Sequence, residues 1–371
     1  MKIMFYINSI RHGGAERVMS NLATTLSEKE NECILVTSFQ NESEYLLGHK
    51  VRRISLFENK LCCNFLKRNI ALISSLRKCL KEERPDILIS FMAEPNFRSI
   101  LASIGLKNKT LISVRNDPNK EYSNVFTRIL AKTLFSFADG IVFQTVDAKK
   151  WFPQIIQKKS KVIFNQVDET FYNTRYVGVR RDVVSTGRLV SQKNHKMLIK
   201  AFSSISDQIS DNLIIYGDGE MRTELEALIS ELDMEKRIFL PGVIDDVSNT
   251  IKSAKLFVLS SDYEGMPNSL MEAMALGLPC ISTDCPCGGP RVLLEGVADE
   301  FLIPIGEEEE LALKLLYLLT RDNKCLEEIA VRVRKKADLF KPNVIFEQWN
   351  TYIEYVLNGY SFGVNKFFLK R

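Results

Sequence analysis

The stretch "LFVLSSDYEGMPNSLMEAMALGLPCISTD", residues 256–284, places a helical pattern between two short apolar runs. The runs LFVLSS and LPCISTD have the length and composition of buried strands. Pro267 is well suited to the start of a helix, and Asn268 or Ser269 can accept hydrogen bonds from its first backbone N–H groups. This order predicts a strand, a helix and a second strand parallel to the first.

The same alternation runs through the rest of the chain and predicts an α/β fold. Ten further apolar runs are separated by helical patterns: IMFYI, CILVTSF, DILISF, TLISV, GIVFQT and KVIFN in the first half, then DVVSTGR, NLIIYG, RIFLPG and EFLIPI in the second. One sheet of about twelve strands would be unusual. Because residues 168–181 are polar and turn-like, we place a domain boundary there.

The predicted architecture is therefore two Rossmann-like domains, 1–168 and 181–340, whose parallel sheets face a cleft. Ligands are expected at the carboxyl ends of the strands. A tail, 341–371, begins with a helix whose apolar residues recur at helical spacing: Phe346, Trp349, Ile353 and Val356. We expect this stripe to be core packing, directed back toward the N-terminal domain.

Composition narrows the classes of protein. The formal net charge of +4 is small beside 50 basic and 46 acidic residues, which does not favour nucleic acid. The adjacent Cys62 and Cys63 suit a reducing compartment, and Cys285 and Cys287 have no nearby histidine, so no metal site is predicted. No apolar run reaches the ~18 residues of a membrane span, so a cytoplasmic or peripheral protein is expected.

Two glutamates in the opening stretch raise a question of chemistry. Glu264 and Glu272 are eight residues apart, and in one helix they would lie on loosely related faces, about 80° apart. A helix that begins between them leaves Glu264 in the preceding loop and Glu272 on about the first turn. Its unpaired N–H groups favour an anion such as phosphate. The stretch predicts a site for a phosphorylated, hydroxyl-rich ligand.

Three other turns carry residues that suit such a ligand. GGAERV puts Gly13 and Gly14 at a strand-to-helix turn, although glycine pairs are common there. GRLVSQKN puts Arg188 and Lys193 beyond a strand end, where they can bind a diphosphate or can be ordinary surface charges. YGDGE allows close backbone approach at Gly217.

Taken together, these motifs resemble those of glycosyltransferase family 4, the retaining enzymes of GT-B fold. The resemblance covers most of the chain and rests on GGAERV, GRLVSQKN, YGDGE, PGVIDDV, SDYEGMPNSLMEAMALGLPCISTD and GGPRVLL. It implies that Arg188 and Lys193 bind the donor diphosphate and that Glu264 binds the donor sugar. It also implies donor contacts from Gly14, Gly217, Val243, Ile244, Met266, Pro267, Asn268, Ser269 and Glu272.

Within that list the resemblance gives several residues distinct roles. Glu272 would accept from the ribose hydroxyls, the backbone at Val243 and Ile244 would meet the base, and Gly14 would lie against the diphosphate from the opposite domain. Such enzymes need no metal, which agrees with the absence of an Asp-x-Asp pair.

The chain departs from the family at one position. Many relatives have a histidine after the strand that corresponds to DILISF, where this chain has MAEPN. Glu94 or Asn96 would replace it, and Arg115 and Asn116 follow the next strand. These four are the candidate acceptor residues.

The expected function is retaining transfer of a sugar from a nucleotide diphosphate, with UDP as the expected nucleotide, to a glycan acceptor that a lipid can carry. Capsule, lipopolysaccharide or oligosaccharide assembly would use such a step. A non-catalytic nucleotide-sugar-binding protein is the alternative. An NAD-dependent enzyme would need G-x-G-x-x-G, which neither GGAERV nor GDGEMR matches.

Residues 60–81 combine lysine and arginine with apolar residues and suit either an anionic membrane or a solvated helix face.

Overall fold

The computed structural model describes residues 1–11, 13–40, 44–59 and 64–359. The chain divides into two compact units. Unit 1 is Met1–Ile163 with the chain from Ile345 onward, and unit 2 is Phe164–Val344. The division thus falls a few residues before the predicted boundary at 168–181.

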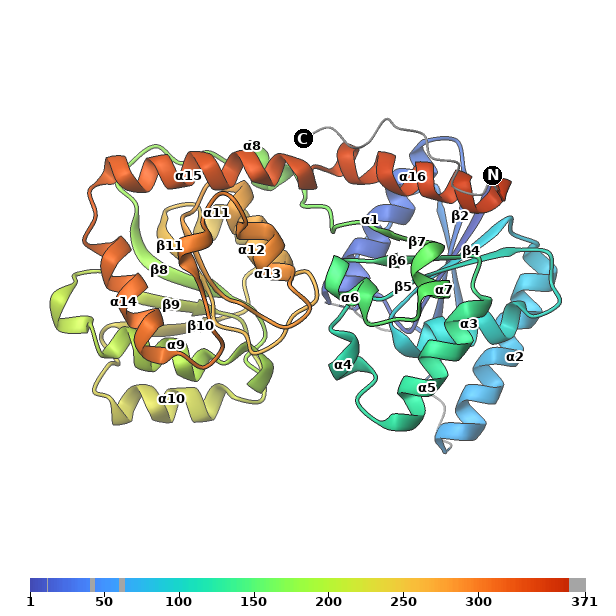
Figure 1. The fold of residues 1–371 in the computed structure, drawn as a ribbon, viewed down its shortest axis with the longest axis horizontal. Coiled ribbons are helices and arrows are strands. Elements are labelled where there is room, and N and C mark those ends of the chain that lie inside the picture. Colours follow the sequence, from blue (N-terminus) through green and yellow to red (C-terminus); the bar gives the residue numbers. More distant parts are fainter. Residues whose placement is uncertain (12, 41–43, 60–63, 360–371) are drawn as a thin grey trace. The chain divides into compact units, whose positions relative to one another are not determined.

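Unit 1 contains one seven-stranded sheet in which every neighbouring pair is parallel. Its order is β3-β2-β1-β4-β5-β6-β7 (Figure 1). The strands are β1 Lys2–Ile7, β2 Glu32–Phe39, β3 Val51–Phe57, β4 Ile87–Phe91, β5 Lys109–Ser113, β6 Gly140–Phe143 and β7 Ser160–Val162. All six runs predicted in the first half are strands, whereas β3, at the sheet edge, was not predicted.

Helices cover both faces of this sheet because each crossover between parallel strands must return across it. They are α1 Gly14–Glu28, α2 Phe65–Glu83, α3 Ala93–Ser103, α4 Pro118–Glu121, α5 Val125–Leu134, α6 Val146–Lys150, α7 Gln154–Lys158 and α16 Pro342–Asn358. A short 3₁₀ turn, η1, follows α5 at Phe135–Phe137.

Unit 2 repeats the design with six parallel strands in the order β10-β9-β8-β11-β12-β13. They are β8 Arg181–Thr186, β9 Leu213–Tyr216, β10 Ile238–Gly242, β11 Ala254–Leu259, β12 Cys280–Thr283 and β13 Leu302–Ile303. The main helices are α8 Glu169–Asn173, α9 His195–Ser203, α10 Arg222–Glu231, α11 Val247–Ile251, α12 Asn268–Ala275, α13 Gly289–Leu294, α14 Glu308–Leu319 and α15 Asn323–Ala337.

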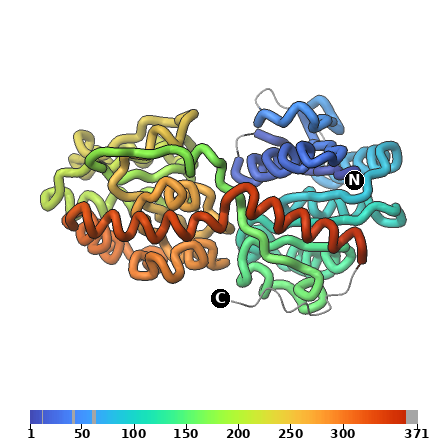
Figure 2. The backbone as a smooth tube through the Cα atoms, turned by 90° about the horizontal axis from the view of Figure 1, so that it is seen from above, coloured from blue at the N-terminus to red at the C-terminus, as the bar shows by residue number. Residues whose placement is uncertain are grey.

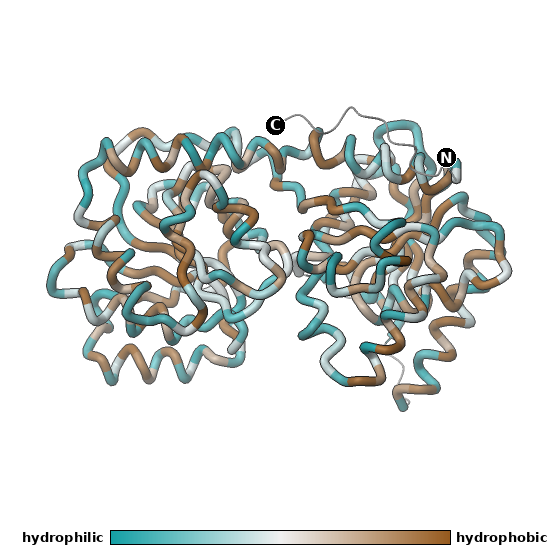
Figure 3. The backbone as a smooth tube through the Cα atoms, viewed as in Figure 1, coloured by the Kyte–Doolittle hydropathy of each residue, from teal (hydrophilic) through white to brown (hydrophobic). Residues whose placement is uncertain are grey.

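The core of each unit lies between its sheet and the covering helices. The central strands are buried on both faces, as β4 shows with all five residues buried, and the tube through them is mostly brown in Figure 3. Such strands read as continuous apolar runs, which is why the sequence pattern predicted them. The strand order reverses between β1 and β4 in unit 1 and between β8 and β11 in unit 2. At such a reversal the loops beyond the carboxyl ends diverge and leave room for a ligand.

The C-terminal helix α16 packs against unit 1 through the predicted stripe. Phe346, Trp349, Ile353 and Val356 are all buried, and the Trp349 ring stacks on Phe91 at the end of β4. Two further bonds come from Tyr352, whose hydroxyl donates to the Lys159 carbonyl at 2.6 Å and accepts from the Ile141 N–H at 3.0 Å. Figure 2 shows the helix, in red, lying across other segments of this unit.

None of the helices in the described part of the chain is both long and apolar enough to span a bilayer.

Candidate active site

Helix α12 begins between the two glutamates. It starts at Asn268, so Glu264 lies in the loop before it and Glu272 is its fifth residue. The predicted helix start is therefore correct, but the N-cap residue is Pro267 and not Asn268 or Ser269, and it makes no side-chain cap bond in the described part of the chain. The Asn268 amide oxygen instead accepts from Asn165 Nδ2 at 2.6 Å. The Ser269 hydroxyl is buried without a hydrogen-bond partner in the described residues.

The centre of the site in unit 2 is an ion pair between Lys193 and Glu264. Lys193 Nζ lies 2.6 Å from Glu264 Oε1, and both side chains are largely buried. The fully buried Ser261 hydroxyl donates to the same carboxylate oxygen at 2.8 Å. Glu264 Oε2 has no hydrogen-bond partner among the described residues. One carboxylate oxygen is therefore fixed by the protein, and the other can accept from a ligand hydroxyl.

Hydrogen bonds tie the two loops that carry this pair. Lys193 ends a 3₁₀ turn after β8, whereas Glu264 follows β11. The Ser260 hydroxyl donates to the Lys193 carbonyl at 2.9 Å, and the Asp262 N–H donates to the Gln192 carbonyl at 2.9 Å. Because β8 and β11 are neighbours at the reversal in strand order, these loops lie at the predicted ligand position.

Side-chain amides complete the connection between the loops. Gln192 Nε2 donates to the Tyr263 carbonyl at 2.8 Å, and Asn194 Nδ2 donates to Asp262 Oδ1 at 2.8 Å. Sequence reasoning singled out Lys193 and Glu264 but missed these supports, along with Ser261 and Asn165. Gln192, Asn194, Ser261 and Asp262 lie within the quoted motifs, which was the only signal for them. Asn165 lies outside these motifs, so the sequence contained no signal for it.

Glycines allow four loops of unit 2 to touch in two pairs. A Cβ on Gly217, which has φ +139°, would lie 1.8 Å from the Gly187 carbonyl oxygen. A Cβ on Gly289 would lie 1.9 Å from the Gly265 carbonyl oxygen. The glycines of YGDGE and GGPRVLL therefore pack backbone against backbone around the site. This is a second use for glycine, beside the close ligand approach that the sequence suggested.

The remaining predicted donor residues surround these loops. Arg188 follows β8 by two residues and is exposed, with no ion-pair partner among the described residues. Val243 and Ile244 follow β10; Val243 is exposed and Ile244 is half-buried. Met266 and Pro267 are buried just before α12. Unit 2 thus brings a free guanidinium and a paired ammonium to the carboxyl edge of one sheet.

In unit 1 the predicted acceptor residues also follow strand ends, but they differ in accessibility. Glu94 lies in the first turn of α3, is half exposed, and forms an ion pair with Arg98. Asn96 is fully buried: its amide oxygen accepts from the Ser90 hydroxyl, and its Nδ2 donates to the Ser113 carbonyl. Asn96 links β4 to β5, so an acceptor contact there would require these bonds to break.

Arg115 and Asn116 lie beyond β5. The Arg115 guanidinium lies 4.3 Å from the centre of the Phe91 ring, and burial lowers the pKa of Arg115 to about 9. The Asn116 side chain accepts from the Asp117 N–H. Sequence reasoning missed Glu121, which accepts from the Ala93 N–H at the start of α3 and whose pKa burial raises to about 7. Gly14 is the first residue of α1, directly after its N-cap Gly13.

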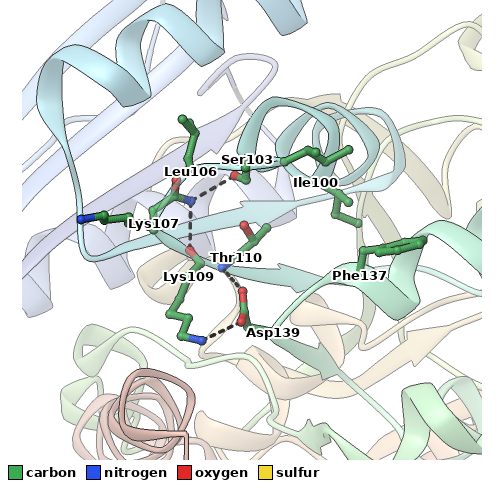
Figure 4. Close-up of a pocket in the computed structure, with 11 residues that line it drawn as sticks. Ile100, Ser103, Leu106, Lys107, Lys109, Thr110, Phe137 and Asp139 are labelled. Carbon is green, nitrogen blue, oxygen red and sulfur yellow. Dashed lines mark hydrogen bonds and ion pairs between the residues drawn. The ribbon is translucent and has the colours of Figure 1, made fainter.

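Of two cavities, one lies away from the site and one lies beside the loops that carry Lys193 and Glu264. The larger, about 330 Å³, is at the amino ends of β5 and β6, where Lys109 and Asp139 form an ion pair (Figure 4). The predicted residues of unit 1 are at the opposite, carboxyl edge. A smaller cavity of about 120 Å³ in unit 2 is lined in part by His195 and Asp262. Within the described ranges, no cluster of three or more potential ligands could hold a metal.

Protonation of the buried His195 side chain is expected to destabilise the protein at acid pH. Burial, and then the charge of Lys193, lower the pKa of this side chain from 6.5 to about 4. The folded state therefore binds the proton more weakly than the unfolded state, and stability present above pH ~6.5 is lost as the pH falls toward ~4. Relative to His195→Gln, the wild-type protein should lose about 3 kcal/mol of unfolding free energy across this range.

Urea unfolding of both proteins from about pH 7 to about pH 4 measures this difference, because other titrating groups are common to both. Parallel stability curves would contradict the assignment.

Two family models match the chain. "Glycosyltransferase Family 4" matches residues 12–171, and "Glycosyl transferases group 1" matches residues 173–337. A Campylobacter jejuni relative is the GalNAc-α-(1→4)-GalNAc-α-(1→3)-diNAcBac-PP-undecaprenol α-1,4-N-acetyl-D-galactosaminyltransferase. It is 29% identical over 371 aligned residues, which cover 97% of this chain and 100% of the relative. An Escherichia coli relative, the UDP-Gal:α-D-GlcNAc-diphosphoundecaprenol α-1,3-galactosyltransferase, is 26% identical, covering 87% and 88%.

Solved structures show the same fold. Anabaena HepE in complex with UDP and glucose has a TM-score of 0.80 at 20% identity, covering 95% of this chain and 99% of HepE. Sucrose-phosphate synthase from Thermosynechococcus elongatus has a TM-score of 0.84 at 15% identity, covering 97% and 100%. The expected fold is thereby confirmed: the chain belongs to glycosyltransferase family 4, of group 1, and is a retaining glycosyltransferase of GT-B fold.

Proposed function

We propose that this enzyme transfers a hexose from a UDP-sugar to a glycan carried on a polyprenyl diphosphate, during assembly of a surface polysaccharide or oligosaccharide. The Lys193–Glu264 pair carries the proposal. It places one cation and one carboxylate at the carboxyl ends of β8 and β11, beside the start of α12. A nucleotide sugar presents the matching groups, an anionic diphosphate next to neutral hydroxyls.

Donor binding follows from what each group can accept or donate. Lys193 and Arg188 donate to the diphosphate, and the N–H groups at the start of α12 add to its stabilisation. Glu264 accepts from hydroxyls of the transferred sugar through Oε2, while Ser261 holds Oε1. Glu272 accepts from the ribose diol, and the backbone at Val243 and Ile244 meets the uracil edge.

Retention follows from attack on the face from which the diphosphate departs. The bond between the sugar C1 and the phosphate oxygen breaks, and the acceptor oxygen bonds to C1 on the same face. The acceptor proton passes to the departing phosphate oxygen, so no protein nucleophile is needed. Lys193 and Arg188 stabilise the negative charge that grows on that oxygen.

The acceptor is proposed from the relatives. The two relatives named above act on glycans linked to undecaprenyl diphosphate, according to their names, and HepE is solved with UDP. Glu94, Arg115 and Asn116 of unit 1 are the residues proposed to bind the acceptor. Gly14 is proposed to approach the diphosphate.

The test is UDP release from a panel of UDP-hexoses, with and without lipid-linked oligosaccharide extracted from bacterial membranes. We expect one donor to give acceptor-dependent UDP and a lengthened glycan. A non-catalytic binding protein would bind UDP but would form no UDP from the UDP-hexoses. This outcome would overturn the proposal.

We expect the reaction to be independent of divalent metal, because the two cations and the start of α12 neutralise the diphosphate. An excess of chelator should leave the turnover rate within about twofold of the untreated enzyme, well below the roughly tenfold or larger loss expected for removing a catalytic metal. Activity that is lost with chelator and restored by Mg²⁺ or Mn²⁺ would refute this expectation.

A further inference from the structure

Two helices of unit 1, α2 and α5, begin with an asparagine cap followed by apolar residues. At the start of α2 the Asn64 side chain accepts from the Lys67 N–H at 2.9 Å, and at the start of α5 the Asn124 side chain accepts from the Thr127 N–H at 2.8 Å. The sequences that follow these caps, FLKRNI and VFTRIL, both place bulky apolar residues directly after the cap and an arginine at the fourth helical position.

The apolar residues of these helix starts are exposed. They are Phe65, Leu66 and Ile70 of α2 and Val125, Phe126 and Ile129 of α5, each between 58% and 74% exposed. A helix on the surface of a globular protein normally turns its apolar residues toward the core. Further along α2, Leu72, Leu76 and Leu80 do so. The stripe Leu66, Ile70, Ile73 and Leu76 therefore passes from exposed to buried along the helix.

We name these six side chains the helix-start patch; its two halves lie at the same edge of unit 1. Helix α2 follows β3 and α5 follows β5, and each returns across the sheet, so both helices begin on the side of the strand carboxyl ends. Helix α3 packs against both of them, and Figure 1 shows all three in one group. In Figure 3 brown tube is visible at the start of α5, at the lower edge of this unit.

Basic side chains accompany the patch, and acidic ones are nearly absent. Lys67 and Arg68 stand between the apolar residues of α2, and Arg128 and Lys132 do so on α5. Residues 64–81 and 122–138 contain no aspartate or glutamate. The acids of α2 are Glu82 and Glu83, at its opposite end, and α5 contains none.

We propose that the helix-start patch is a docking surface for an anionic lipid bilayer. Bulky apolar side chains flanked by lysine and arginine match the chemistry of the headgroup region, where apolar groups enter the acyl boundary and cations meet lipid phosphates. The inference rests on the proposed function, since a lipid-linked acceptor resides in a membrane. It extends the surface expected at residues 60–81 to a second helix; of that range, 60–63 lie outside the described residues.

The test is cosedimentation of the full chain with vesicles of pure phosphatidylglycerol and of pure phosphatidylcholine. The protein should bind the anionic vesicles more tightly. Because each cation near an anionic surface contributes about fivefold in affinity, Arg68→Gln with Arg128→Gln should bind about 25-fold more weakly. Phe126→Ser with Ile129→Ser should also lose binding.

The matched control is Leu313→Ser with Val331→Ser, two exposed apolar residues of unit 2, which should bind as the wild-type protein does. Equal binding of the control and patch variants, or equal binding to both vesicles, would overturn the proposal. So would a dimer in sedimentation velocity that only the patch variants lose, since the patch would then be a contact between copies.

Calorimetric binding of UDP to the same samples separates the two proposals. Vesicle binding without UDP binding would contradict the proposed function, and UDP binding without vesicle binding would contradict the docking surface.

Discussion

Lys193→Ala is expected to lower the turnover rate by about 10²- to 10³-fold, the loss typical of removing one group that stabilises growing charge in a transition state. In the free protein Lys193 Nζ lies 2.6 Å from Glu264 Oε1. This ion pair holds the ammonium in the site before a ligand binds. Arg188→Ala should have an effect of the same order, because its guanidinium is exposed just beyond β8 and has no ion-pair partner among the described residues. The measurement is UDP release at saturating donor and acceptor.

Lys196→Ala provides the matched control. Lys196 is three residues further along, in α9, and its side chain is half exposed in an ion pair with Glu224. Exposed pairs contribute little to stability, and turnover of this variant should stay within about twofold, an energy change below ~0.5 kcal/mol. Turnover near the wild-type rate in both Lys193→Ala and Arg188→Ala would rule out the diphosphate role.

Glu264→Gln and Glu272→Gln are expected to impair different steps, turnover in the first variant and nucleotide binding in the second. If Glu264 binds the transferred sugar, its loss lowers turnover and leaves UDP affinity near the wild-type value, since UDP lacks that sugar. If Glu272 binds the ribose, its loss weakens UDP and donor together, by roughly 1 to 3 kcal/mol for hydrogen bonds to a charged group. Calorimetry with UDP and steady-state kinetics measure the two effects.

Both variants keep the shape of the side chain, and Glu226→Gln, on the exposed face of α10, is a control that should change neither quantity. Glu264→Gln has a structural effect to check as well, because it removes the charge that pairs with Lys193. A thermal unfolding curve separates misfolding from lost chemistry. Reversed effects, or the same effect of both substitutions in both assays, would show that the two roles are wrongly divided.

The sequence predicted the strands that are buried on both faces and missed the one that is not. β4, ILISF, is entirely buried and reads as a continuous apolar run. β3, VRRISLF, pairs only with β2 at the sheet edge, and most of its residues are half-buried or exposed. Its Arg52 and Arg53 form ion pairs with Glu83 and Glu44, which lie 31 and 9 residues away. A search for apolar runs cannot identify a strand whose arginine side chains form ion pairs with glutamates that are distant in the sequence.

Local preference also failed at the start of α12. Asn268 is a good capping residue, yet its amide oxygen accepts from Asn165, which precedes it by 103 residues. Tertiary contact overrides the local choice, and one sequence contains no signal for such a partner. Ser261, which holds Glu264, was missed for a different reason. A serine at a strand end is common, and only the fold shows that its hydroxyl reaches the carboxylate.

The central claim is that the loops after β8 and β11 of unit 2 bind a nucleotide diphosphate through Lys193. Calorimetric titration of UDP into the wild-type protein, Lys193→Ala and Lys196→Ala tests it most directly. We predict that the wild-type protein and Lys196→Ala bind UDP alike, and that Lys193→Ala binds about tenfold or more weakly, as expected for losing a hydrogen bond to a charged group. Equal affinity in all three proteins, or no binding of UDP to the wild-type protein, would contradict the claim.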